Sequence, residues 1–152
     1  MVGTKPRAAR PELFYHARMP RQVIEVRTKQ RSEMVEITER VQHAVTEAGV
    51  TDGRVIVYVP HTTAGVTINE NADPDVVHDM LAQLEQMVPW SQPFYRHAEG
   101  NSASHVKASM MGSSVTVLIK AGKLVLGTWQ GVWFCEFDGS RTRKVIVDVI
   151  GP

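Results

Sequence analysis

Cysteine is nearly absent from this sequence: Cys135 stands alone, so one chain cannot form an internal disulfide. No apolar run approaches the length of a membrane span, and none follows the first basic residues to make a signal peptide. An excess of charge is also missing, because 17 Lys and Arg face 16 Asp and Glu, for a net charge of +1. A dedicated nucleic-acid binder usually carries a concentrated basic surface. We therefore expect a cytoplasmic protein that binds neither nucleic acid nor membrane, although a local basic patch for a phosphate stays open.

The length and composition fit one globular domain. The 152 residues are 43% apolar and 22% charged, close to the averages for such proteins, and no repeat or linker divides them. We interpret residues 1–21 as a short mobile segment that carries basic side chains, and residues 22–152 as the folded domain.

Local signals predict two to three helices. One begins at Thr38, a candidate cap, and ends at Gly49. Asp73-Pro74 is a strong start signal for a second helix, because Asp caps well and Pro suits the first helical position. Apolar residues then recur at helical spacing as far as Val88, and a short third helix is predicted over residues 103–111.

Strand patterns dominate the rest of the chain. They cover residues 22–28, 54–59, 65–68, 115–119, 124–126, 129–137 and 144–150. The turn signals Ala121-Gly122 and Asp138-Gly139 separate neighbouring strands, and strands joined by tight turns must be antiparallel. The pattern predicts an α+β domain.

Three histidines stand beside other polar residues. His61 opens the segment His61-Thr62-Thr63-Ala64-Gly65 directly after a strand, where functional groups are often found. His97 and His105 bracket a second polar stretch that includes Asn101. Three imidazoles are the ligand set of an open zinc site, but their spacing matches no recognised zinc motif. The alternatives are a turn with locally bonded hydroxyls and a structural His105.

Carboxylates and amides crowd the start of the second helix. Capping the helix explains Asp73, but it explains Glu70 and Asn71 less well. A carboxylate at this position would suit a Mg²⁺ ion that also binds substrate phosphates. Farther on, Gln130 and Glu136 share one face of a strand, roughly 20 Å apart, too far to touch one small ligand. Two roles or two subunits are then needed.

The opposite face of that strand is aromatic. Trp129, Trp133 and Phe137 form an apolar stripe of the kind that fills cores and subunit interfaces. We expect it to be too large for one small domain to cover, which favours an oligomer.

Two arginines follow the Asp138-Gly139 turn. Arg141 and Arg143 are suited to fork onto phosphate oxygens. An ion pair with Asp138 or Glu136 explains them equally well.

Taken together, these motifs resemble the YjbQ-like family, also called the secondary thiamine-phosphate synthase family. The resemblance rests on HTTAGVTINENADPD at 61–75, YRHAEGNSASHVKAS at 95–109 and SSVTVLIKAGKLVLGTWQGV at 113–132. It implies a β-sandwich core of mainly antiparallel strands, a homotrimer, and a transferase activity that is a secondary one. That reaction joins hydroxymethylpyrimidine diphosphate to thiazole phosphate and releases pyrophosphate.

The polar motifs and the resemblance together give a set of expected site residues for a small phosphorylated metabolite. The expected catalytic residues are His61, Glu70, His97 and His105. The expected substrate-binding residues are Thr62, Thr63, Asn101, Lys107, Thr128, Gln130, Arg141 and Arg143. A divalent metal, Zn or Mg, is expected at His61, His97 and His105. A metal-dependent hydrolase and a non-catalytic binding module for such a metabolite are the alternatives.

Overall fold

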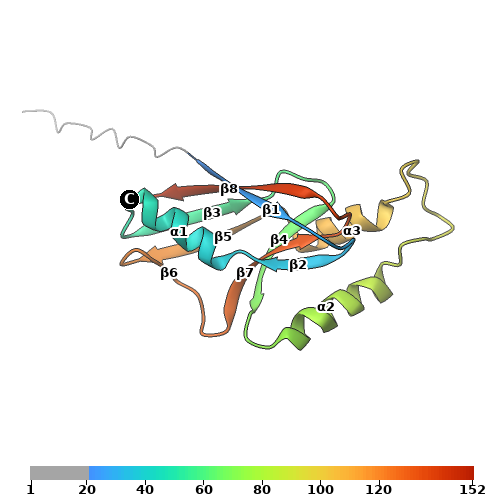
Figure 1. Cartoon of the computed structure of the whole chain (residues 1–152), viewed down its shortest axis with the longest axis horizontal. Helices are drawn as coiled ribbons and strands as arrows, with labels where there is room; N and C mark the ends of the chain where they lie inside the picture. The colour runs from blue at the N-terminus through green and yellow to red at the C-terminus, as the bar shows by residue number, and fades with distance from the viewer. Residues whose placement is uncertain (1–20) are drawn as a thin grey trace, which may run out of the picture.

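Two antiparallel sheets stack face to face in the computed structural model, which describes residues 21–152 (Figure 1). The predicted mobile segment therefore lies outside the described residues, apart from Arg21. The larger sheet has the order β1 (Gln22–Arg27), β8 (Thr142–Ile150), β3 (Gly53–Tyr58), β5 (Ser114–Lys120), β6 (Lys123–Leu124). The smaller sheet has the order β2 (Glu33–Glu36), β7 (Gln130–Glu136), β4 (Ala64–Glu70). With three helices, this confirms the predicted α+β domain.

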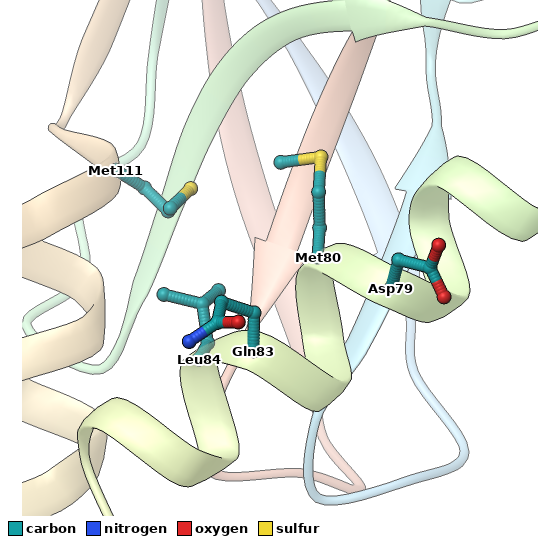
Figure 2. A pocket seen from close by; sticks show the side chains of 5 residues that line it. All are labelled: Asp79, Met80, Gln83, Leu84 and Met111. Carbon is teal, nitrogen blue, oxygen red and sulfur yellow. The ribbon is translucent and has the colours of Figure 1, made fainter.

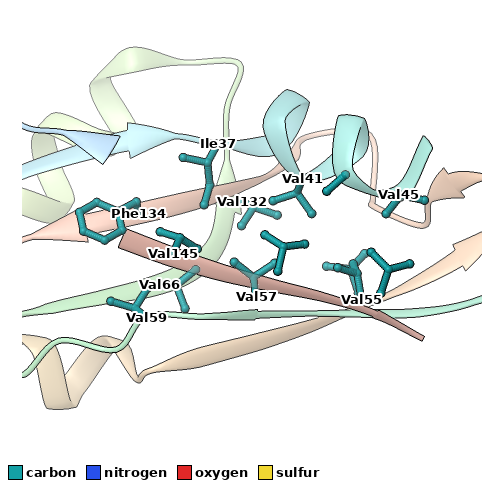
Figure 3. Packing of buried hydrophobic residues seen from close by; sticks show 14 of the residues in the cluster. Ile37, Val41, Val45, Val55, Val57, Val59, Val66, Val132, Phe134 and Val145 are labelled. Carbon is teal, nitrogen blue, oxygen red and sulfur yellow. The ribbon is translucent and has the colours of Figure 1, made fainter. Parts of the chain in front are cut away.

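The main core fills the space between the sheets and is rich in valine. Alternate residues of each strand point inward, as the period of a strand requires. Figure 3 shows Val55, Val57 and Val145 of the larger sheet packed with Val66 and Phe134 of the smaller one. These β-branched side chains suit a pleated surface, which explains why this part of the chain forms strands.

The helices follow the predicted signals closely. Helix α1 spans Thr38–Ala48 and ends at Gly49, which adopts the left-handed conformation (φ 65°). Helix α2 spans Pro74–Met87, and the Asp73 carboxylate accepts a hydrogen bond from the Asp75 amide at 2.9 Å. Helix α3 spans Ser102–Met111. Thr38 is the first helical residue rather than the cap, because its hydroxyl binds Glu36 and the Val132 amide instead. No helix within residues 21–152 is long and apolar enough to span a membrane.

Helices α2 and α3 cover the outer face of the smaller sheet and create a second core. Phe137, Cys135 and the partly buried Trp133 lie there, packed with Leu84 and Ala108. Burial raises the pKa of the Cys135 thiol to about 12, so this thiol is unreactive. The predicted aromatic stripe is therefore covered within the chain, and of its three members only Trp129 is largely exposed, at 63%.

The segment after β7 is not a hairpin, contrary to the antiparallel pairing expected across Asp138-Gly139. Strand β7 belongs to the smaller sheet and β8 to the larger one, so the turn carries the chain across the sandwich. The Asp-Gly turn signal does not distinguish a hairpin within one sheet from a crossing between two sheets. Here an ion pair inside the sandwich fixes the crossing, as described below. The Ala121-Gly122 turn does join an antiparallel pair, β5 and β6. Strand β2 was not predicted and pairs with β7.

Candidate functional site

The polar segment after β3 and one side of α3 enclose a pocket. It has a volume of about 460 Å³ and is lined by His61, Thr62, Ala64, His105, Ala108, Ser109, Gly112 and Ser113. A neighbouring hollow of about 400 Å³ shares His105 and Ser109 with it. The described residues that line the pocket offer two imidazoles and three hydroxyls, and none of them carries a carboxylate. Such a lining suits an anionic oxygen better than a cation.

Gly65 allows α3 to approach β4 closely enough to form this pocket. A methyl group at Gly65 would lie only 2.7 Å from the Gly112 carbonyl oxygen and 2.9 Å from the Met111 Cβ. The Val66 amide donates to the same Gly112 carbonyl at 3.1 Å, which ties the end of the helix to the strand. The glycine of the HTTAG motif is therefore required for packing, and it brings His105 to the side of His61.

His61 is held by the main chain of β8. Its Nε2 lies 3.0 Å from the Lys144 amide nitrogen and 3.1 Å from the Lys144 carbonyl oxygen. Burial, followed by the nearby Arg143 guanidinium, lowers the pKa of His61 below its usual value. The ring is therefore neutral at pH 7.

A buried ion pair contacts Thr63, the residue after Thr62 of the pocket lining. Arg143 donates from Nε and Nη2 to the two oxygens of Glu136, at 2.8 and 2.6 Å, and from Nη2 to the Thr63 hydroxyl at 2.8 Å. The Glu136 carboxylate also accepts hydrogen bonds from Thr28 and from the amides of Phe137 and Asp138. Two predicted substrate-binding residues, Arg143 and Thr63, are thus buried in this network. Thr63 directly follows Thr62 of the pocket lining, and neither Thr63 nor Arg143 is among the residues that line it.

The other arginine has a local partner at the surface. Arg141 donates to the Asp138 carbonyl and carboxylate, each at 2.8 Å, with its side chain half exposed. Asn101, the residue before α3, donates to the same carboxylate at 3.1 Å. The two arginines therefore form the ion pairs that were the alternative to phosphate binding, with Arg143 buried and Arg141 exposed.

The residues around His105 divide between two sides of α3. The rings of His97 and His105 meet edge to face, with centroids 5.2 Å apart. The His105 Nε2 atom is buried, and it makes no hydrogen bond to any residue that the structure describes. Lys107 faces away from both rings, because its ammonium group is buried against Glu85 of α2. His105 thus lines the pocket with its Nε2 enclosed and without a partner among the described residues, whereas Lys107 joins two helices.

A third group of predicted residues lies at the opposite end of β4. Glu70 pairs with Gln130 across the β4–β7 ladder, whereas Ala64, next to the pocket, pairs with Glu136. Six residues of strand separate these pairs, roughly 20 Å. The Gln130 side chain instead accepts the Gly127 amide at 2.8 Å and closes the turn that contains Thr128. Glu70, Thr128 and Gln130 therefore do not join His61 and His105 within one chain.

The three histidines do not form a metal site in one chain. No group of three or more His, Cys, Asp or Glu side chains within residues 21–152 is arranged to hold a metal ion. His61 also uses Nε2 for the Lys144 main chain. The geometry of the described residues does not fit three-histidine coordination, and the zinc or magnesium site stays a prediction.

Sequence reasoning did not select Ser109 and Ser113, which line the pocket. Ser109 follows His105 by four residues, so both lie on one side of α3. The four-residue spacing from His105 could have identified Ser109 from the sequence. No comparable pattern marks Ser113.

A separate apolar hollow of about 410 Å³ lies between α2 and the end of α3 (Figure 2). Figure 2 shows Met80 and Leu84 on α2 and Met111 on α3 along its walls, with Asp79 and Gln83 also lining it. Because it lacks a group of converging polar atoms, we do not assign it as the site.

Gly65→Ala tests how the pocket is assembled. The added methyl group must displace α3 from β4, so we expect a loss of about 1–3 kcal/mol in the free energy of unfolding, measured with urea. Gly151→Ala is the control, because its methyl group would meet only Val50, at an ordinary 3.8 Å. A Gly65→Ala protein as stable as the wild type would show that this close approach is not needed.

Comparison with known proteins gives one consistent result. The family model described as UPF0047 protein YjbQ-like matches residues 22–152. The UPF0047 protein YugU of Bacillus subtilis is 49% identical over 128 residues, which cover 84% of this chain and 97% of YugU. The UPF0047 protein MJ1081 of Methanocaldococcus jannaschii is 50% identical over 127 residues, covering 84% of this chain and 91% of that protein.

Solved structures agree in fold as well as in sequence. The crystal structure of an uncharacterized conserved protein of the yjbq/upf0047 family from Clostridium acetobutylicum has a TM-score of 0.83 and 52% identity. It covers 85% of this chain and 99% of its own. A YbjQ-like protein of unknown function from Sulfolobus solfataricus has the same TM-score at 29% identity, covering 88% of this chain and 97% of its own. The chain belongs to the YjbQ-like (UPF0047) family.

Proposed function

We propose that the pocket between His61 and His105 binds a small phosphorylated metabolite and supports a secondary thiamine-phosphate synthase activity in the cytoplasm. In that reaction a thiazole phosphate displaces pyrophosphate from a hydroxymethylpyrimidine diphosphate. The observation that carries the proposal is the lining of the pocket. Imidazoles and hydroxyls converge there without a carboxylate among the described lining residues, and a carboxylate would repel a phosphate.

The required chemistry is modest. The thiazole nitrogen is already a nucleophile and needs no strong base, so the site has chiefly to orient the two substrates and shield the reacting carbon from water. The leaving pyrophosphate needs donors or cations for its growing charge. His105 and the hydroxyls of Thr62 and Ser113 would serve as those donors. The Ser109 hydroxyl donates instead to the His105 carbonyl at 2.9 Å.

Three basic side chains around the pocket are already paired with carboxylates, which favours a slow reaction. Arg143 is bound to Glu136, Lys107 to Glu85 and Arg141 to Asp138. A pyrophosphate leaving group would thus receive stabilisation from neutral donors, which contribute less than charged ones, and from the exposed Lys144, whose charge acts on His61. This is what a secondary activity requires. The predicted role of Arg141 and Lys107 in substrate binding would need these pairs to open.

A binding module without turnover is the second candidate. It is favoured by the position of Glu70, which was expected to be catalytic and lies at the far end of β4 from the pocket. Tight binding of a phosphorylated metabolite by a protein without synthase activity would support it.

His105→Asn separates a functional from a structural role. Asparagine keeps a polar side chain but removes the protonation chemistry of the imidazole. We expect thiamine phosphate formation to fall at least about tenfold, a transition-state loss of about 1.4 kcal/mol. The melting temperature should change little, because the buried Nε2 of His105 has no partner within residues 21–152.

The control is His78→Asn, which changes an exposed histidine on α2. It should leave both activity and melting temperature at the wild-type values. A His105→Asn protein that melts earlier but keeps full activity per folded molecule would refute the functional role.

We also propose that the protein is a homotrimer. The support is the outer face of the larger sheet, where Val23, Tyr58, Leu118 and Val125 are 43–61% exposed. Register places these residues on one side: Val23 and Tyr58 both pair with Ile146, and Leu118 pairs with Arg54, on the same side of β3 as Tyr58. Several large apolar side chains exposed on one face of a sheet favour an interface at that face.

Light scattering tests this assembly. We expect the wild type at micromolar concentration to show about three times the chain mass of 16.9 kDa. Leu118→Glu should shift it toward the monomer, because a carboxylate would be buried without a partner. Met87→Glu, at an exposed position on α2, is the matched control and should not change the mass. A monomeric wild type would contradict the proposal.

A further inference from the structure

The imidazole of His61 occupies a place in the larger sheet that the main chain leaves open. The β3–β8 ladder pairs Tyr58 with Ile146, and the same register would put Pro60 opposite Lys144. Proline has no amide hydrogen, so it cannot complete the ladder there. His61, the next residue, brings Nε2 to 3.0 Å from the Lys144 amide nitrogen and 3.1 Å from its carbonyl oxygen.

This contact leaves one ring nitrogen for the pocket. Nε2 is committed to Lys144, so a ligand would meet Nδ1. The Lys144 amide is only a donor, and an amide without an acceptor is rarer than a carbonyl with a free lone pair. The amide therefore donates to Nε2, and the ring proton resides on Nδ1. The neutral state of the ring agrees with the lowered pKa of His61, caused first by burial and then by Arg143.

We propose that His61 is a fixed, neutral hydrogen-bond donor, which binds a phosphate oxygen of the ligand through Nδ1–H while Lys144 holds Nε2. This inference rests on the proposed phosphate-binding function of the pocket and gives His61 a defined part in it. In this arrangement His61 offers no free nitrogen to a metal ion, because one nitrogen is bound to the main chain and the other carries a proton. The pocket then selects an anionic oxygen by oriented neutral donors.

Nitrogen NMR of the protein with labelled histidine tests the tautomer without any ligand. We expect the His61 Nδ1 signal to be that of a protonated nitrogen and the Nε2 signal that of an unprotonated one. A protonated Nε2 would overturn the inference. Inorganic phosphate should then shift the Nδ1 signal of His61, and added zinc should not.

The phosphate titration separates this inference from the function on which it rests. If phosphate shifts the His105 signals but not those of His61, the pocket binds phosphate and the role given to His61 is wrong. If phosphate shifts neither histidine, the proposed function fails, and the donor role of His61 fails with it.

Two substitutions at His61 distinguish its two nitrogens. In His61→Asn the side-chain amide reaches the position of Nδ1, and in His61→Gln it reaches that of Nε2. We expect His61→Gln to keep the melting temperature, because it retains the contact with Lys144, and to lose about tenfold in phosphate affinity, as for one hydrogen bond to a charged group. His61→Asn should bind phosphate more tightly than His61→Gln and melt earlier. The reverse order in both measurements would overturn the proposal.

Discussion

Glu136 ends β7 and Arg143 lies near the start of β8, so their ion pair joins the smaller sheet to the larger one inside the protein. Burying an unpaired charge costs several kcal/mol, so such a pair persists only when its geometry is good and its remaining groups are satisfied. Here the carboxylate accepts hydrogen bonds from Arg143, Thr28 and two amides. The pair thereby fixes the crossing of the chain from one sheet to the other.

The candidate site is assembled on this support. Arg143 holds Thr63, the Lys144 main chain holds His61, and Gly65 lets α3 approach β4, so that His105 lines the same pocket as His61. Each contact fixes a polar group by packing or by the main chain, which leaves neutral donors facing the pocket. Preorganised donors of this kind suit phosphate recognition more than proton transfer. The same arrangement is the support for the proposed binding of a phosphorylated metabolite and for the proposed weak coupling activity.

Sequence reasoning succeeded where the signal was local and failed where it was tertiary. Asp73-Pro74 and Gly49 mark helix ends through contacts within a few residues, so both ends were found. Lys107 was expected to bind the substrate as a cation in the polar stretch around His105. It lies two residues after His105, and two residues of helix turn it to another side, toward Glu85. The ion pair of Arg143 with Glu136 was one of the alternatives from the sequence. The burial of that pair could not be predicted, because it depends on how the two sheets stack. Glu70 was grouped with His61 by motif, although a full strand separates them.

A double-mutant cycle on the free energy of unfolding tests the central role of the buried pair most directly. Glu136→Gln and Arg143→Met each leave one buried polar group without its charged partner, and each should cost about 3–5 kcal/mol. The double variant removes both charges, so its loss should be smaller than the sum of the single losses by more than about 1 kcal/mol. Losses that simply add would contradict the account, because they would mean that the two side chains stabilise the sheets independently.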